Sequence, residues 1–327
     1  MNICIIKLGA LGDLVRTLPI AKAISDSHLG SKITWITKNK ALDFLKNQPF
    51  ISEAMQIPCQ IKENFDILYN FDIEDEATSL ADLIKAEKKF GFYKEAGFVQ
   101  AFNLGAEYYL NTLFDDGIKK SNRKTYQEMM FMAAEMPYKN ELVPLILSEQ
   151  SKEYASDFVK ANNLRTEKLI GIHFGASSRW PSKIWHKSNL KEFIGLAKQE
   201  GYEIMLFGGP NETAELKSLA SEMSLCHNNP NNTNLEFASL VDKCSLMICS
   251  DSFALHISLA LKKPTIALFF CTSPDEVEGY RLLKKIASPL IGEFFPERMD
   301  QYSEELVKSI SASEVIAEVK NIIHRNK

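Results

Sequence analysis

The chain has 327 residues, more than one ordinary α/β domain holds and enough for two domains of about 150 residues each. Hydrophobic residues make up 45% and charged residues 24%, an ordinary globular composition that gives no reason to expect disorder. The formal net charge of −4 argues against nucleic acid as a general partner, because binding a phosphate backbone needs a basic face.

The cysteine pattern and the apolar runs bear on location. Six cysteines are scattered along the chain and no pair has C-x-x-C spacing, which favours buried thiols in a reducing compartment over disulfides or a zinc site. Residues 1–4 run directly into a strand without a basic region or a cleavage site, and no apolar run approaches the roughly 20 residues that span a bilayer. We therefore expect no bound metal, no secretory signal and a cytoplasmic protein that at most rests on a membrane surface.

The first predicted elements are a strand, a glycine turn and a helix. Residues 2–7 (NICIIK) are β-rich without alternation, which is typical of a strand covered on both faces of a parallel sheet. The turn LGALGD follows, and residues 14–28 carry apolar side chains at helical spacing. A G-x-G-x-x-G fingerprint would need a third glycine where Val15 or Arg16 stands, so an NAD site is disfavoured. Asp13 either caps this helix or presents a carboxylate at the carboxyl edge of the sheet, where open α/β folds place their chemistry.

The alternation of strand and helix continues through the first half. Strands are predicted at 32–37 and 65–71 and helices at 39–46 and 77–92, a pattern that indicates a doubly wound sheet. An acidic turn, residues 72–76 (DIEDE), lies between the last of these strands and its helix. The turn follows the carboxyl end of a strand and so belongs near the same edge as Asp13; the alternative is a solvated loop.

Aromatic-rich sequence of less regular pattern fills residues 97–123 and leads into a basic run, residues 119–124 (KKSNRK). This run is either a solvated face or a contact to an anionic membrane or acceptor. A Met-rich helix at 125–136 is expected to pack in the core. Prolines and helix-stop signals coincide at 137–144, so we assign residues 1–140 to an N-terminal domain.

The second half opens like the first. A strand at 169–174 is followed by a loop, and its GIHFGASSR parallels IIKLGALGD at the start of the chain, which supports two similar nucleotide-binding-type domains. We assign residues 141–312 to a C-terminal domain and expect the terminal helix, in 313–327, to pack back on the N-terminal domain. Further helices are predicted at 148–162, 189–199, 212–223 and 234–241.

A strand at 203–207 ends in GGPNE, which carries candidate ligand contacts. Gly208 lets a ligand approach the backbone closely. Glu212 either accepts hydrogen bonds from ribose hydroxyls or complements the dipole of the helix that it begins.

The stretch 245–270 indicates a strand, an Asp-Ser turn, a short helix and a second strand. The start of such a helix can hold a phosphate on its backbone N–H groups. Asp251, Ser252 and His256 therefore outline a donor-nucleotide site, with His256 four positions after Ser252 on one helix face. The alternative is a capping aspartate and a packed histidine.

Four stretches in this order carry a family resemblance. They are LGALGDLVRTLP (8–19), GASSRWPSK (175–183) with Trp185, FGGPNE (207–212), and DSFALH (251–256) followed by PTIALF (264–269). Each motif is weak alone, but together they resemble glycosyltransferase family nine, the bacterial heptosyltransferase family. The resemblance implies a GT-B fold, in which two Rossmann-like domains face a central cleft. It also implies an inverting, metal-independent transfer of a heptose-type sugar from an ADP-linked donor to a saccharide or glycolipid of the lipopolysaccharide core. The enzyme would work at the cytoplasmic face of the inner membrane, without a cofactor.

The resemblance also implies roles for individual residues. Asp13 matches the catalytic base, and Gly12 and Arg16 lie beside it as acceptor contacts. Inverting transfer needs a base on the face opposite the departing nucleotide, so Lys183 from the other domain would meet the charge of the leaving diphosphate. The implied donor contacts are Ser177, Ser178, Lys183, Gly208, Glu212, Asp251, Ser252 and His256.

The sequence departs from the family pattern at two places. Phe253 stands where a glycine usually follows the Asp-Ser pair, and Phe270 and Cys271 replace a usual Gly-Pro. These departures motivate the alternative of a non-catalytic sugar-nucleotide-binding protein of the same fold. A sugar-nucleotide epimerase of related architecture is a third reading.

Overall fold

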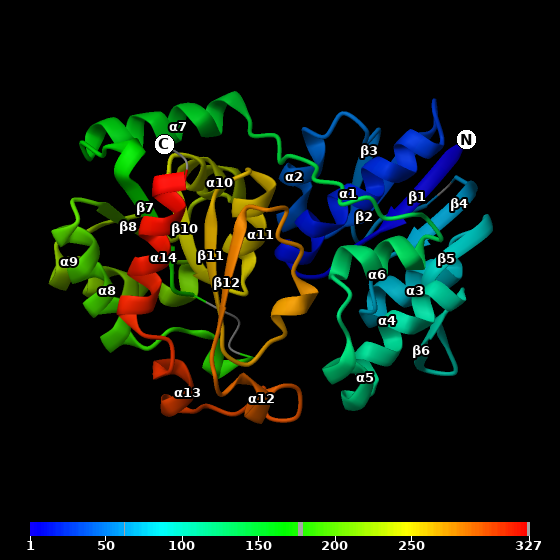
Figure 1. Cartoon of the computed structure of the whole chain (residues 1–327). Coiled ribbons are helices and arrows are strands. Elements are labelled where there is room, and N and C mark those ends of the chain that lie inside the picture. Colours follow the sequence, from blue (N-terminus) through cyan, green and yellow to red (C-terminus); the bar gives the residue numbers. More distant parts are fainter. Residues whose placement is uncertain (62, 176–178, 326–327) are drawn as a thin grey trace. The chain divides into compact units, whose positions relative to one another are not determined.

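A computed structural model describes residues 1–61, 63–175 and 179–325 of the chain (Figure 1). The chain divides into two compact units. Unit 1 comprises Met1–Ile146 together with Asp275–Glu278, and unit 2 comprises Leu147–Pro274 and Gly279–Lys327. The division thus falls after Ile146, later than the position 140 expected from the sequence, and a short segment from the second half returns to unit 1.

Unit 1 is built on a six-stranded sheet with the order β3-β2-β1-β4-β5-β6. All neighbours in it are parallel except β5 and β6, which form an antiparallel hairpin. The central strands are buried on both faces, which explains their unbroken apolar sequences. The strands are β1 (Asn2–Ile6), β2 (Lys32–Thr37), β3 (Glu53–Gln56), β4 (Phe65–Asn70), β5 (Ala86–Glu95) and β6 (Phe98–Ala101).

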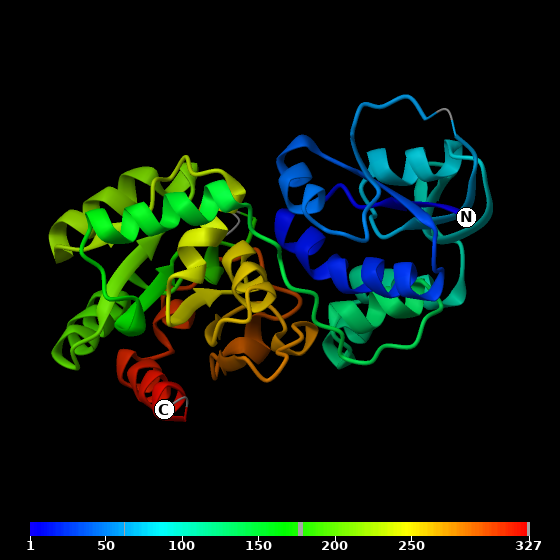
Figure 2. The same ribbon diagram turned by 90° about the horizontal axis from the view of Figure 1, so that it is seen from above.

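Helices cover both faces of this sheet, with α1 and α6 on one side and α3 on the other (Figure 2). Alternate residues of β1 serve the two faces, so Cys4 and Ile6 join the core beneath α3. The helices of unit 1 are α1 (Leu11–Ser27), α2 (Leu42–Lys46), α3 (Asp75–Leu83), α4 (Leu104–Phe114), α5 (Asp116–Ser121) and α6 (Tyr126–Ala133), with a single turn η1 (Asn39–Ala41).

The helix predicted over 77–92 is wrong in its second half. Helix α3 ends at Leu83, and the chain continues as β5, in register with β4 from Phe65↔Ala86 to Asn70↔Gly91. Gly91 adopts a φ of +89°, and a Cβ there would lie 1.9 Å from the carbonyl oxygen of Asn70. Pairing with the buried strand therefore overrides the helical spacing, and glycine is required where the two strands approach most closely.

Unit 2 repeats the architecture with a fully parallel six-stranded sheet of order β12-β11-β10-β7-β8-β9. Its strands are β7 (Leu169–His173), β8 (Glu203–Phe207), β9 (Cys226–His227), β10 (Leu246–Ser250), β11 (Thr265–Phe269) and β12 (Leu283–Ala287). Its helices are α7 (Glu149–Ala161), α8 (Lys187–Gln199), α9 (Thr213–Met223), α10 (Asn234–Asp242), α11 (Phe253–Ala260), α12 (Ile291–Phe294), α13 (Glu304–Lys308) and α14 (Ala312–Arg325). Single turns lie at η2 (Thr166–Lys168), η3 (Pro181–Lys183), η4 (Pro210–Glu212) and η5 (Pro274–Glu276). The prediction of two doubly wound α/β domains is confirmed.

Terminal helix α14 packs beside α8 in unit 2 (Figure 1). Val315 and Val319 are buried in the same core as Phe193 of α8. The apolar stripe of the helix therefore completes the core of its own unit, whereas the sequence analysis expected the helix to pack back on the N-terminal domain.

The returning segment is tied to unit 1 at both of its ends. Arg123 forms an ion pair with Asp275, with 3.5 Å between Nε and Oδ2. Tyr138 donates a hydrogen bond of 2.9 Å to Glu278. One charge of the basic run at 119–124 is thus engaged in an ion pair within the chain. Among the described residues, no helix combines the length and the apolar character that crossing a bilayer requires.

Candidate functional site

The candidate site of unit 1 begins in the turn between β1 and α1. The N-cap of α1 is Ala10, which makes no side-chain cap, and Asp13 lies in the first helical turn. Asp13 is therefore not the helix cap. Its carboxylate pairs with Arg16 at 2.8 Å between Oδ1 and Nη2, and its side chain is 31% exposed. A partly exposed carboxylate thus lies beside a guanidinium just past the carboxyl edge of the sheet, as the sequence predicted.

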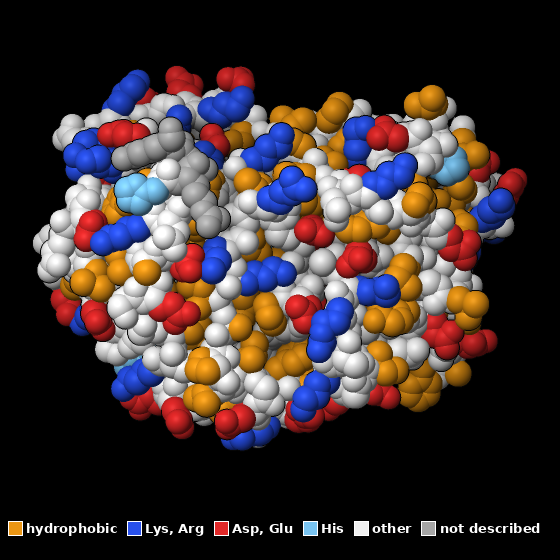
Figure 3. Space-filling model, in the orientation of Figure 1, with side chains coloured by type: hydrophobic (Ala, Val, Ile, Leu, Met, Phe, Trp, Pro, Cys, Tyr) orange, Lys and Arg blue, Asp and Glu red, His pale blue; other side chains and the backbone are white. Residues whose placement is uncertain are grey.

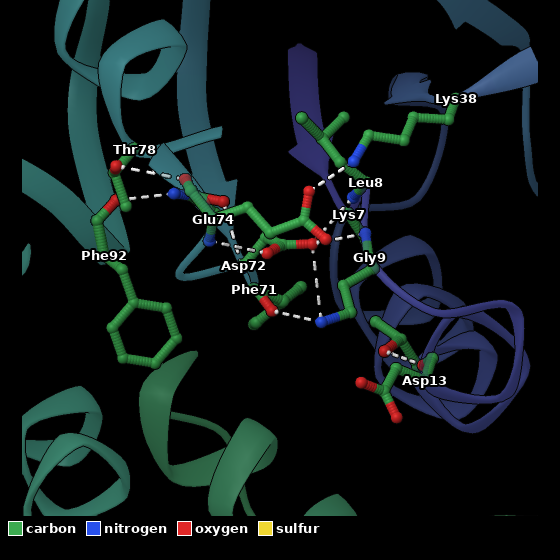
Figure 4. A network of polar contacts seen from close by, with 12 residues as sticks. Lys7, Leu8, Gly9, Asp13, Lys38, Phe71, Asp72, Glu74, Thr78 and Phe92 are labelled. Atoms are coloured by element: carbon green, nitrogen blue, oxygen red, sulfur yellow. Dashed lines mark hydrogen bonds and ion pairs between the residues drawn. The ribbon is translucent and has the colours of Figure 1, made fainter. Parts of the chain in front are cut away.

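Asp72 holds the glycine turn in place from the end of the neighbouring strand β4 (Figure 4). One oxygen of its carboxylate accepts hydrogen bonds from the backbone N–H groups of Leu8 at 2.8 Å and Gly9 at 2.6 Å. The other oxygen accepts one from Glu74 at 2.9 Å. Asp72 is only 2% exposed, so at this position the acidic turn is a buried clamp rather than a solvated loop.

Lys7 neutralises this buried carboxylate. Its ammonium lies 3.5 Å from Asp72 and donates a hydrogen bond of 3.1 Å to the carbonyl of Phe71. Burial raises the pKa of Asp72, but Lys7 and the backbone N–H groups outweigh it, and the pKa lies below its usual value. Burial lowers the pKa of Lys7, but the influence of Tyr126, Asp72 and Asp13 outweighs it, and the pKa lies above its usual value. Both groups are therefore charged at neutral pH.

In unit 2, Lys183 is brought to the start of helix α11. Its ammonium lies 2.8 Å from the carboxylate of Asp251, and both side chains are largely buried. The preceding residue, Ser182, anchors the loop by donating to the carbonyl of Gln301 at 2.8 Å and accepting from the N–H of Ser303 at 3.0 Å. Lysine and helix start are thus assembled in one place. The predicted contacts Ser177 and Ser178 lie outside the described residues.

The loops after β7 and β8 also meet. Glu212 accepts a hydrogen bond of 2.8 Å from the N–H of Gly209, so it caps its own turn. A Cβ on Gly175 would lie 2.9 Å from the carboxyl carbon of Glu212, which puts the two loops in direct contact. Gly208 lies beside the same side chain, since a Cβ there would be 3.2 Å from the Cβ of Glu212.

The turn between β10 and α11 involves a histidine that the sequence analysis did not single out. Ser252 is the N-cap of α11, but its hydroxyl makes no cap and lies 3.3 Å from Nδ1 of His173, at the end of β7. Burial lowers the pKa of His173 to about 4, so the ring is neutral at physiological pH. His256 is buried within α11, in keeping with the packed-histidine alternative. The signal for His173 was its place in GIHFG, directly before the loop.

Phe253 lies against Phe237 of α10, with ring centroids 5.4 Å apart. Phe237 in turn contacts His173 and Phe207 at 5.9 Å and 5.4 Å, so Phe253 belongs to an aromatic cluster beside the helix start. Cys271 is buried in the core, and burial raises the pKa of its thiol to about 11. It is therefore a protonated core residue at neutral pH.

Among residues 1–61, 63–175 and 179–325, no group of three or more His, Cys, Asp or Glu side chains is arranged to hold a metal ion. In unit 2, Lys183 and the start of α11 supply positive charge and N–H donors. In unit 1, Lys7 and Arg16 supply positive charge near Asp72 and Asp13.

Comparison with known proteins gives one consistent result. Residues 57–306 match the model of glycosyltransferase family 9 (heptosyltransferase). Lipooligosaccharide heptosyltransferase 2 of Haemophilus influenzae is 22% identical over 313 residues, which cover 84% of this chain and 85% of that protein. The crystal structure of a family 9 glycosyltransferase from Veillonella parvula aligns with a TM-score of 0.80 at 18% identity, covering 99% of this chain and 97% of the other. The E. coli heptosyltransferase WaaC, solved with ADP-2-deoxy-2-fluoro heptose, aligns with a TM-score of 0.65 at 15% identity, covering 98% and 100%.

Proposed function

The chain belongs to glycosyltransferase family 9, and from this membership we propose that it transfers a heptose-type sugar from an ADP-linked donor to a saccharide of the lipopolysaccharide core, with inversion at the anomeric carbon. It is a glycosyltransferase of GT-B fold that uses a nucleotide sugar. The observation that carries the donor assignment is the ion pair of Lys183 and Asp251, which brings a lysine to the start of α11.

The donor diphosphate binds in unit 2 in this proposal. The N-terminal end of α11 offers backbone N–H groups and partial positive charge, and Lys183 adds a full charge beside it. In the structure the Lys183 ammonium is paired with the Asp251 carboxylate, so the lysine is already oriented before a phosphate competes with Asp251 for it. Gly208 and Glu212 lie where a ribose would approach the backbone. Ser252 and the neutral His173 present a hydroxyl and a ring nitrogen next to the same helix start.

The acceptor binds in unit 1, with Asp13 as the base. The acceptor hydroxyl oxygen forms a bond to the anomeric carbon, the bond from that carbon to the diphosphate oxygen breaks, and the hydroxyl proton passes to Asp13. A carboxylate paired with Arg16 is a weak base at neutral pH, so it takes the proton late, as the hydroxyl becomes acidic. Lys183 and the helix start meet the charge that develops on the departing diphosphate, a role that preorganised groups fill effectively.

Gly12 and Arg16 are the proposed acceptor contacts, since both lie in the first turns of α1. The Arg16 guanidinium is paired with Asp13, so its first role is to orient the base. The earlier alternative of a non-catalytic binding protein depended on Phe253 and Cys271. The ring of Phe253 packs against Phe237, and Cys271 lies in the core, so neither observation favours that alternative.

The test is a transfer assay with purified protein, ADP-heptose and a deacylated core acceptor. We expect acceptor-dependent release of ADP from ADP-heptose, and much slower release of GDP or UDP when GDP- or UDP-linked sugars replace it. Acceptor-dependent turnover of a UDP-sugar, with none of the ADP-sugar, would overturn the donor assignment. Slow ADP release that ignores the acceptor would overturn the acceptor assignment.

We further propose a cytoplasmic location with peripheral contact to the inner membrane. The site of contact is the corner of α4 and α5, where Phe114 is 70% exposed and Lys119 and Lys120 end α5. Charges elsewhere are mixed, as the face in Figure 3 illustrates, so the attraction is local. Flotation with anionic vesicles should weaken for Lys119→Glu/Lys120→Glu and stay unchanged for Lys152→Glu on α7. Equal flotation on neutral vesicles would contradict the proposal.

A further inference from the structure

Tyr126 lies at the start of the Met-rich helix, for which the sequence suggested only core packing. It is the first residue of α6 and is 1% exposed. The helix start is fixed by a capping box, in which the Thr125 side chain accepts from the N–H of Glu128 and the Glu128 carboxylate accepts from the N–H of Thr125. The position of the Tyr126 ring is thus set by the backbone that carries it.

Two cations lie over the ring of Tyr126. The guanidinium carbon of Arg16 is 3.8 Å from the ring centroid, and the ammonium of Lys7 is 5.8 Å from it. Tyr109 of α4 meets the ring edge-on, with centroids 5.9 Å apart and an interplanar angle of 81°. An aromatic face attracts such cations, and more strongly when they are shielded from water. The ring of Tyr126 therefore makes cation–π contacts with both Arg16 and Lys7.

Tyr126 reaches Asp13 by two separate routes without touching it. On one route, the ring carries Arg16, whose Nη2 lies 2.8 Å from the Asp13 carboxylate. On the other, the Tyr126 hydroxyl lies 3.1 Å from the Thr17 hydroxyl, which donates a hydrogen bond of 2.6 Å to the backbone carbonyl of Asp13. One side chain from α6 thus fixes both the partner of the carboxylate and the helix turn that bears it.

We propose that Tyr126 is a positioning residue for the proton-accepting carboxylate of Asp13, holding Arg16 in place through its ring and the first turn of α1 through its hydroxyl. The inference rests on the proposed role of Asp13 as base. Tyr126 itself touches neither donor nor acceptor in this assignment, and its effect passes through Arg16 and Thr17.

The charged and titratable groups around Asp13 come from every element of this cluster. They are Lys7 at the end of β1, Arg16 on α1, Asp72 after β4, Tyr109 on α4 and Tyr126 on α6. Two cations near one carboxylate favour its ionised form. Without the ring, Arg16 can swing toward solvent, so the carboxylate loses its partner and becomes easier to protonate.

The test compares Tyr126→Leu with Tyr126→Phe, which keeps the ring and loses only the hydroxyl. For Tyr126→Leu we expect the acid limb of the pH profile of kcat/KM to move up by about half a unit to one unit. We also expect kcat to fall about 10- to 100-fold, because the base is misplaced. The KM for the donor should not change. Tyr126→Phe should keep the acid limb in place. Phe131→Leu, which removes a buried ring from the same helix, is the matched control and should lower only the melting temperature.

Two further measurements keep the inference separate from the proposed function. In an Arg16→Ala background, Tyr126→Leu should move the acid limb no further, because the ring acts through Arg16. Carboxyl NMR of aspartate-labelled protein, assigned with Asp13→Asn, reports the titration of Asp13 without any turnover. A raised midpoint in Tyr126→Leu supports the inference even if no transfer is found, in which case only the proposed function fails. An unmoved midpoint in an active enzyme overturns the inference.

Discussion

At the scale of single residues, Asp13, the proposed base, combines two properties. Its side chain is 31% exposed, which leaves room for a substrate hydroxyl to approach, and its carboxylate is paired with the guanidinium of Arg16. Ionised carboxylates of this kind accept protons only when the donor hydroxyl has become acidic. Its contribution is thus largest in the transition state and small in ground-state binding.

Asp13→Asn should therefore lower kcat by about 10²- to 10⁴-fold and leave ADP affinity within about twofold. The amide keeps the shape of the side chain and removes its capacity to accept a proton. Transfer assays and calorimetry with ADP measure the two effects. Asp26→Asn, on the exposed last turns of the same helix, is the control and should behave as wild type. Turnover retained by Asp13→Asn would remove this residue as the base.

A complementary prediction concerns Lys183 and the donor. Lys183→Ala should raise the activation free energy of transfer by about 3–4 kcal/mol, because it removes a preorganised charge where the diphosphate departs. ADP binding should weaken as well. Lys191→Ala removes a partly buried lysine of the same unit that pairs with Glu222, and it should change neither quantity. An equal loss in both variants would point to bulk charge rather than to a phosphate contact.

The residues of the candidate site differ in how visible they were in the sequence. Asp13, Lys183, Glu212 and Asp251 stand in motifs directly after strands, where chemistry gathers in such folds. His173 and Tyr126 were passed over, and Asp72 was noted only as part of the acidic turn at 72–76. Asp72 sits in an acidic run that resembles a solvated turn, and the partners that bury it, Lys7 and the N–H groups of Leu8 and Gly9, are more than 60 residues away in sequence. Partners so distant in the sequence cannot be predicted from local sequence patterns.

At the scale of elements, the glycine turn between β1 and α1 is held by the Asp72 carboxylate, which follows β4, the neighbour of β1 in the sheet. Because Asp72 satisfies the N–H groups of Leu8 and Gly9, the turn that leads to Asp13 is fixed by the end of β4. A substitution of Asp72 therefore affects the whole turn between β1 and α1.

Asp72→Asn should lower the free energy of unfolding at neutral pH by about 3–5 kcal/mol, because Lys7 is left buried without its carboxylate. The folded-state pKa of Asp72 lies below its usual value, so its stabilisation is complete above the ordinary carboxyl pKa near 4 and is lost as pH falls below that. The difference between wild type and variant should shrink below about pH 4. Urea unfolding at several pH values measures this. Asp75→Asn, at an exposed position of α3, should cost little; a pH-independent difference for Asp72→Asn would contradict the linkage.

Elements with a buried periodic sequence were predictable, and those defined by pairing were not. The strands 2–7, 65–71 and 169–174 were found because both of their faces are apolar. Strand β5 was assigned to a helix, since its first residues are mostly polar, including the adjacent Lys88 and Lys89, and only pairing with β4 makes it extended. The short edge strands β3 and β6 carry little apolar signal and were missed.

At the scale of the whole molecule, donor binding should stabilise unit 2 locally. At ADP concentrations 100 times Kd, we expect about 2.7 kcal/mol of added stability. Hydrogen exchange should show protection at 180–185, 208–212 and 250–256, with little change in β5 and β6. ADP-dependent protection confined to residues 7–16 would instead place the donor in unit 1.

The sequence predicted the architecture of the whole molecule because each half repeats the strand and helix alternation of a doubly wound sheet. It placed the division at 140 rather than after Ile146, since prolines and charges mark a linker only approximately. It could not indicate the return of Asp275–Glu278, which depends on ties to Arg123 and Tyr138 far upstream.

That return has a consequence for recombination between family members. The polypeptide passes between the units at three points, after Ile146, Pro274 and Glu278, so one splice site cannot exchange a complete unit. A chimera designed to borrow acceptor preference from a relative must transplant the tetrapeptide 275–278 together with residues 1–146. If the host's tetrapeptide stays behind, the grafted counterparts of Arg123 and Tyr138 meet foreign side chains, and hybrids joined at a single crossover should lose cooperativity on unfolding.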